Sequence, residues 1–125
     1  MEIKKAPDIK ELIERLLPHL PMAYVDARQI TCVRSFRAKS RARARICSFP
    51  KIWQLALGEP PHYVIEVLSQ HFDHLSVDDK IRVLIHELMH IPKNFSGALV
   101  PHRSLHKRIN SRTVENLFKL YKNSR

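Results

Sequence analysis

The hydrophobic residues between positions 8 and 17 recur at intervals of three and four, the spacing of one helical face. They are Ile9, Leu12, Ile13, Leu16 and Leu17. Asp8 is followed three residues later by Glu11, a capping-box pattern that predicts the start of this helix. Pro18 and Pro21 predict its end, because proline interrupts helical hydrogen bonding.

Alternation of apolar and polar residues then predicts two β-strands. The first runs from about Arg28 to Phe36, with Ile30, Cys32 and Phe36 on one face. The second covers residues 41–48, where Ala42, Ala44 and Ile46 alternate with Arg41, Arg43 and Arg45. We therefore expect the second strand to present one basic face to water.

The two strands could form a hairpin that turns at Lys39 and Ser40. That register would place Cys32 opposite Cys47, where a cross-strand disulfide could form. Two small buried thiols are the favoured expectation, because disulfides are rare in a reducing cytosol.

A proline and a tryptophan mark the next segment. Pro50–Leu57, which contains Trp53, predicts either a helical turn or a hydrophobic plug. Tyr63–Leu68 follows as a third strand that is apolar on both faces except at Glu66.

Two helices complete the predicted elements. Ser76, with Asp79 three residues later, predicts the start of a helix that continues to His90, where Pro92 stops it. Residues 91–110 are expected to form a loop. The last helix spans about Ser111 to Lys122, with a buried stripe of Val114, Leu117, Phe118 and Tyr121.

These elements predict one α+β domain over residues 1–125, a length typical of a single domain. We expect a small, twisted, mostly antiparallel sheet of three or four strands. The helix that ends at His90 and a C-terminal helix should pack against it.

Composition narrows the class of protein. Hydrophobic residues make up 44% and charged residues 27%, which excludes wholesale disorder. No apolar run approaches the ~18–20 residues of a membrane span, and the first residues lack the apolar core of a signal peptide. We expect a cytoplasmic protein with no membrane partner.

The net charge of +10 is unevenly distributed along the chain. Residues 59–92 carry six acidic and two basic side chains, whereas the segments on either side are strongly basic. A basic excess favours acidic partners, and nucleic acid is a possible one. No stacking motif or helix-turn-helix pattern accompanies the charge.

The predicted chemistry lies in residues 86–90, which read His-Glu-Leu-Met-His. Positions i and i+4 share one side of a helix, so His86 and His90 can reach one metal ion. Zinc lowers the pKa of a bound water toward ~7, and Glu87 is placed to accept its proton as general base. We expect one Zn²⁺ per chain.

A catalytic zinc usually has three protein ligands and leaves the fourth position to water. Three residues after the motif could supply the third ligand. His102 is the first choice, because its loop is long enough to curl back under the helix end. His106 and then Glu115 are the alternatives.

Residues 83–102, which contain the motif and His102, resemble the archaeal and phage metallopeptidase family of zincin-like proteins. Residues 43–46, 50–54 and 63–67 resemble it too, so the similarity covers most of the chain. The resemblance implies a minimal zincin-like fold, with metal ligands at His86, His90 and His102 and the motif glutamate at Glu87. A more distant similarity is to the SprT-like proteases, which act on DNA-bound proteins.

The sequence therefore predicts a zinc metallopeptidase that hydrolyses peptide bonds of a peptide or protein substrate. Three other interpretations stay open. One is a basic nucleic-acid-binding protein with a structural zinc site, and another is a SprT-like protease acting on DNA-bound proteins. The third is a hydrolase of a non-peptide bond, such as that of an amide or a nucleotide. Glu87 separates catalytic from structural zinc, because a structural site has no use for a base.

Overall fold

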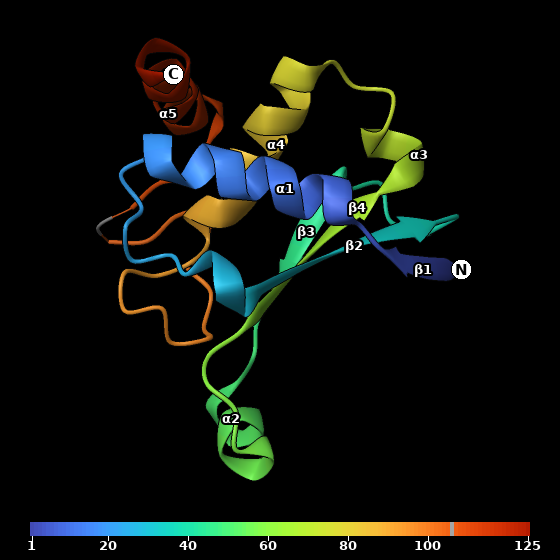
Figure 1. The fold of residues 1–125 in the computed structure, drawn as a ribbon, viewed down its shortest axis with the longest axis vertical. Coiled ribbons are helices and arrows are strands. Elements are labelled where there is room, and N and C mark those ends of the chain that lie inside the picture. The colour runs from blue at the N-terminus through green and yellow to red at the C-terminus, as the bar shows by residue number, and fades with distance from the viewer. Residues whose placement is uncertain (106) are drawn as a thin grey trace.

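The computed structural model describes residues 1–105 and 107–125, and it has an α+β architecture built on a four-stranded sheet (Figure 1). The strand order is β1-β2-β4-β3. The strands are β1 (Glu2–Lys5), β2 (Ile30–Phe36), β3 (Ala44–Cys47) and β4 (Tyr63–Leu68). The α-helices are α1 (Pro7–Leu16), α2 (Lys51–Leu57), α3 (Ser69–Phe72), α4 (Val77–Met89) and α5 (Ser111–Ser124). Two short 3₁₀ turns, η1 (Leu17–His19) and η2 (Ala27–Gln29), lie between α1 and β2.

The expected hairpin between the second and third strands is wrong, because β4 lies between them. β4 pairs with β2 in parallel and with β3 in antiparallel register. Tyr63, Ile65 and Val67 of β4 are buried on one face of the sheet, and its neighbours β2 and β3 pair with its backbone along both edges. β3 is accordingly an end strand, and it begins at Ala44 rather than near residue 41.

This topology separates the two cysteines. Cys32 is aligned with Ile65 and Cys47 with Val64, on opposite sides of the central strand. Both thiols are free, and only Cys32 is buried. The expectation of two buried thiols is therefore wrong for Cys47.

The start of the first helix also differs from the expected capping box. The N-cap is Ala6, and no side chain caps the helix. Asp8 instead forms an ion pair with Arg34 of β2, at 2.8 Å between Oδ2 and Nη2. Strand β1, which pairs with β2, was not predicted, because its single apolar side chain gives no alternating pattern.

Helices α1 and α4 cover one face of the sheet. Ile30 and Cys32 of β2 and Ile65 and Val67 of β4 belong to the same buried cluster as Ile13 of α1. Leu84, Ile85 and Leu88 of α4 complete this cluster on the side of β3. On the other face Glu66 is nearly buried and accepts a hydrogen bond of 2.7 Å from Nε of Arg45. No helix in the described part of the chain is long and apolar enough to cross a membrane.

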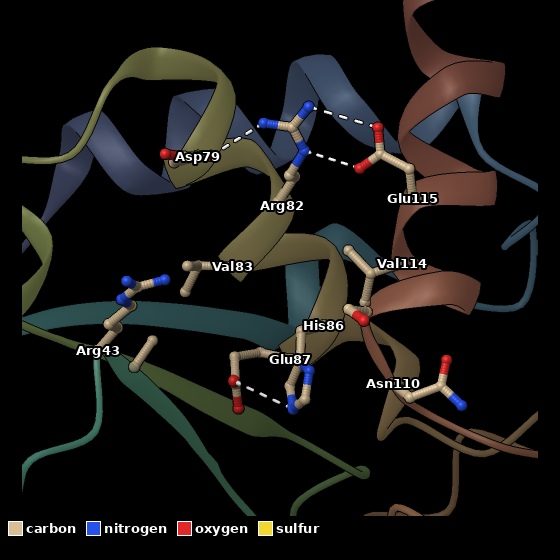
Figure 2. Close-up of a pocket in the computed structure, with 11 residues that line it drawn as sticks. Arg43, Asp79, Arg82, Val83, His86, Glu87, Asn110, Val114 and Glu115 are labelled. Carbon is tan, nitrogen blue, oxygen red and sulfur yellow. Dashed lines mark hydrogen bonds and ion pairs between the residues drawn. The ribbon is translucent and has the colours of Figure 1, made fainter.

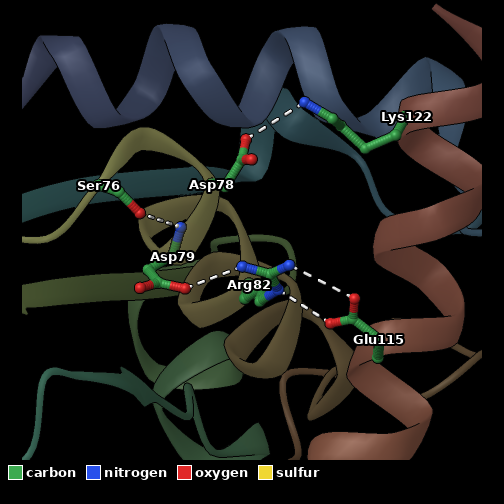
Figure 3. A network of polar contacts seen from close by, with 6 residues as sticks. All are labelled: Ser76, Asp78, Asp79, Arg82, Glu115 and Lys122. Atoms are coloured by element: carbon green, nitrogen blue, oxygen red, sulfur yellow. Dashed lines mark hydrogen bonds and ion pairs between the residues drawn. The ribbon is translucent and has the colours of Figure 1, made fainter.

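Helices α4 and α5 are joined by polar contacts (Figure 3). The guanidinium of Arg82 contacts Asp79, at 2.9 Å, and Glu115 of α5, also at 2.9 Å. Its Cζ lies 4.1 Å from the ring centre of Phe118. Asp78 and Lys122 form a second link between the helices at 3.3 Å. Arg82 therefore anchors the C-terminal helix to α4.

Replacing Arg82 by alanine is expected to lower the free energy of unfolding by about 1–2 kcal/mol, because an ion-pair network and a cation–π contact are lost together. Arg82→Lys should recover only part of the lost stability, since a lysine ammonium cannot bind both carboxylates with the several planar N–H donors of a guanidinium. Urea unfolding followed by circular dichroism measures the difference. Equal stability of wild type and Arg82→Ala would show that the network contributes nothing.

Candidate metal centre

Helix α4 positions two histidines one turn apart. Ser76 caps its first turn by accepting a hydrogen bond from the backbone N–H of Asp79, as the sequence predicts. Leu84, Ile85 and Leu88 are fully buried and fix the rotation of the helix on the core. His86 and His90 then project together, with ring centres 5.2 Å apart, and His90 forms the C-cap.

The loop after α4 brings a third histidine to this pair. Val100 hydrogen bonds twice to His90: its N–H donates to the His90 carbonyl at 2.7 Å, and its carbonyl lies 2.6 Å from His90 Nδ1. His102, two residues later, lies with its Nε2 3.1 Å from Nε2 of His86. One ring nitrogen from each of the three histidines lies within 4.8 Å of the other two.

Two residues hold this loop against the sheet. Tyr63 of β4 is buried, and its hydroxyl accepts from the Gly97 N–H at 2.9 Å and donates to the Ala98 carbonyl at 2.8 Å. Gly97 has φ +93°, and a Cβ there would lie 2.4 Å from the Phe49 carbonyl. Only glycine fits at that position. Sequence reasoning missed both roles, although Gly97 is one of only two glycines in the chain.

Replacing Tyr63 by phenylalanine is expected to lower the free energy of unfolding by about 1–3 kcal/mol, because a buried N–H and a carbonyl lose their partner. Thermal unfolding of the metal-free protein measures the loss. Tyr24→Phe is a suitable control, because its hydroxyl makes no hydrogen bond within the described residues. An unchanged melting temperature in Tyr63→Phe would show that the loop does not depend on this hydroxyl.

The donor set fits a divalent metal such as zinc. Two nitrogens bound to one tetrahedral zinc at ~2.0–2.1 Å are about 3.3 Å apart, close to the separation of the His86 and His102 nitrogens. Nδ1 of His90 is hydrogen bonded to the Val100 carbonyl, so Nε2 is the ring nitrogen that remains for the cluster. This arrangement is typical of metal-binding histidines. No fourth His, Cys, Asp or Glu among the described residues joins the three.

Burial sets the protonation of the cluster. It lowers the pKa of His86 to about 4, with the charges of His90 and His102 acting in the same direction. Burial also lowers the pKa of His90. Both imidazoles are therefore neutral near pH 7, which leaves a lone pair on each for a metal ion.

Glu87 is the acidic residue beside this cluster. Its side chain is 9% exposed, and its Oε2 lies 4.0 Å from Nε2 of His86 (Figure 2). Loss of hydration raises the pKa of this carboxyl to about 7. Glu87 can therefore exchange a proton near neutral pH in this environment.

Two cavities are both lined by His86, Glu87 and Ala44 of the end strand. One, of about 460 Å³, extends between α4, α5 and β3, where Val83, Val114 and Arg43 line it (Figure 2). The other, of about 380 Å³, includes His90, His102 and Leu99. The histidine cluster thus lines a cavity that borders an end strand of the sheet, and His86 also lines the neighbouring cavity.

The structure distinguishes among the residues considered for the third position. It places His102 with His86 and His90, whereas the carboxylate of Glu115 pairs with Arg82. His106 lies outside the described residues. The sequence could not show that Glu115 already has a partner, because Arg82 is 33 residues away.

Comparison with known proteins gives the family. A family model described as "Putative phage metallopeptidase" matches residues 1–122, so the chain belongs to this family. No curated protein and no solved structure matches the chain. The family and the histidine cluster together indicate a metal-dependent peptidase, whose substrates are peptides or proteins.

Proposed function

We propose that this protein is a zinc-dependent peptidase in which His86, His90 and His102 hold the ion and Glu87 is the general base. The observation that carries the proposal is the convergence of three ring nitrogens beside a buried carboxylate. Two of the histidines and the glutamate come from α4, and the third comes from a loop that His90 itself binds.

A catalytic role is favoured over a structural one by the number of ligands. Structural zinc sites are closed by four protein ligands, whereas catalytic sites keep one position for water or substrate. The described residues supply three candidate ligands, and all three line a cavity that a substrate could enter. Glu87 would be a costly residue to bury in a structural site, because a buried carboxyl without a hydrogen bond loses its hydration.

Each side chain has a defined task in this proposal. When bound, zinc polarises the scissile carbonyl and lowers the pKa of a water ligand toward ~7. Glu87 accepts the proton of the attacking water and then delivers it to the leaving amine. Val100 keeps His90 in the tautomer that presents Nε2.

The substrate would lie along β3. Within residues 1–105 and 107–125 this strand pairs with β4 alone, which leaves its other edge without a strand partner, and Ala44 lines both cavities beside Glu87. An extended peptide could add to this edge as a further strand, gaining affinity from backbone hydrogen bonds of any sequence. A structure with a peptide inhibitor bound across the sheet face would contradict this placement.

The proposal is tested by metal content together with hydrolysis. We expect about one zinc per chain by elemental mass spectrometry, and cleavage of casein or of a fluorogenic peptide pool. A chelator should abolish cleavage, and added zinc should restore it. His71→Ala is the control variant, because His71 lies on α3 away from the cluster. Protein that binds no zinc when it is supplied would overturn the proposal.

A further inference from the structure

Helix α2 stands away from the rest of the molecule (Figure 1). Gln54 is the one half-buried side chain of this helix, and its Nε2 donates to the carbonyls of Phe49, at 2.8 Å, and Ser96, at 2.7 Å. Gly58, with φ +65°, ends the helix in the left-handed conformation. The hydrogen bonds of Gln54 therefore hold one side of the helix against the loop, while its other sides remain exposed.

The free sides of α2 are almost entirely apolar. The exposed fractions are 72% for Ile52, 58% for Trp53, 76% for Leu55 and 59% for Leu57. Ala56 is also exposed, and the 100° step per residue places it at the centre of the arc that these side chains form. We call Ile52, Trp53, Leu55, Ala56 and Leu57 the α2 patch. The sequence-based alternative of a hydrophobic plug is wrong, since Trp53 is not inserted into the core.

Such a patch is unusual on a surface that stays exposed to water. Burying one Leu, Ile or Trp side chain contributes about 1.5–3 kcal/mol, and four neighbouring ones here remain uncovered. Contiguous exposed apolar residues of this extent typically mark a surface that binds a partner.

We propose that the α2 patch is a self-association surface, through which two copies of the chain pair their α2 helices antiparallel about a twofold axis. An isologous pairing covers both patches at once, because each is the partner of the other. Ala56 at the centre lets the two helices approach closely, and the larger side chains of the patch pack around it.

The area agrees with a dimer of modest affinity. At the exposed fractions given above, the four large side chains offer roughly 500 Å² per copy, or about 1,000 Å² across a symmetric pair. This lies near the lower limit of specific protein interfaces, about 1,200 Å². Residues flanking α2 would add to the contact, so we expect an equilibrium between one and two chains at micromolar concentrations.

Charge favours the antiparallel arrangement. Lys51 opens the helix and Glu59 follows its end, and both are exposed without an ion pair among the described residues. Antiparallel pairing brings the end of α2 that carries Lys51 near the partner's end that carries Glu59, whereas parallel pairing would bring like-charged ends together. The segment 51–59 has one basic and one acidic residue, so it carries no net charge to attract an anionic lipid surface.

Sedimentation equilibrium of the full chain tests the proposal. We expect the mass of wild type to rise from 14.7 kDa toward twice that value between about 1 and 300 µM. Leu55→Glu should remain a single chain throughout, with unchanged circular dichroism because the Leu55 side chain is largely exposed. Leu120→Glu, at a site 51% exposed on α5, is the matched control and should dimerise as wild type does.

Trp53 provides a second readout, because it is the only tryptophan. Its emission should shift to shorter wavelength as wild type associates, and it should not shift in Leu55→Glu. Lys51→Glu and Glu59→Lys should each weaken association, and the double variant should restore it.

Three outcomes would overturn the proposal. Wild type could remain a single chain over the whole range, or Leu55→Glu could dimerise as wild type does. The Trp53 shift could instead appear on adding phosphatidylglycerol vesicles to a protein that stays monomeric, which would assign the patch to a lipid surface. None of these measurements depends on zinc or on peptidase activity.

Discussion

Replacing Glu87 by glutamine is expected to lower kcat for peptide hydrolysis by about 10²–10⁴, the usual contribution of a general base. Glutamine has nearly the same shape and cannot accept the proton of the attacking water. KM should change little, because Glu87 acts on the water rather than on the bound peptide in our proposal. The measurement is steady-state cleavage of a fluorogenic peptide that wild type hydrolyses.

Metal content separates this effect from loss of the site. Glu87→Gln should retain about one zinc per chain, since its side chain is not one of the three converging donors. Glu14→Gln, an exposed change on α1, should retain full activity. If Glu87→Gln cleaved peptides at more than about a tenth of the wild-type rate, the proposed base would be wrong and another proton acceptor would be required.

Replacing His102 by alanine is expected to weaken zinc binding by more than about 100-fold. Removing the outer partners of metal ligands already costs 10–100-fold, and His102 is a direct donor in our proposal. A bidentate site on α4 would remain, with two imidazoles from one helix. Competition with a chromogenic zinc chelator gives the dissociation constants of wild type and variant.

Two parallel variants make this result specific. Glu115→Ala should bind zinc as wild type does, because its carboxylate pairs with Arg82. His106→Ala addresses the other residue that the sequence offered as a third ligand, and we expect it to retain zinc. If zinc were lost in either of these variants and kept in His102→Ala, the third ligand would have to be reassigned.

The α4 part of the site could be predicted because it is encoded locally. Ser76 caps the helix as expected, and the spacing of His86 and His90 requires only a regular helix to bring them together. The buried stripe of α5 follows from the same periodicity, with Val114, Phe118 and Tyr121 buried as predicted. Leu117, the fourth residue of the predicted stripe, is only partly buried.

The sheet was harder to predict, because strand order depends on contacts between distant residues. Alternation located β2 and the inward-facing Ala44 of β3, but it could not show that β4 separates them. Glu66 illustrates the difficulty: as an acid in an apolar strand it had no evident partner, and the structure supplies Arg45 from the adjacent strand.

Local chemistry along the chain therefore specified the helix, its two histidines and the glutamate between them, because each depends on neighbours within a few residues. The sequence offered His102 as one of three candidates, and the tertiary structure placed it with that pair. Tertiary structure also buried Glu87 and left α2 uncovered. These depend on Val100 binding His90, on Tyr63 holding the loop and on β3 ending the sheet. Such contacts join segments that are separated in sequence, so they form only when the whole chain folds and brings those segments together.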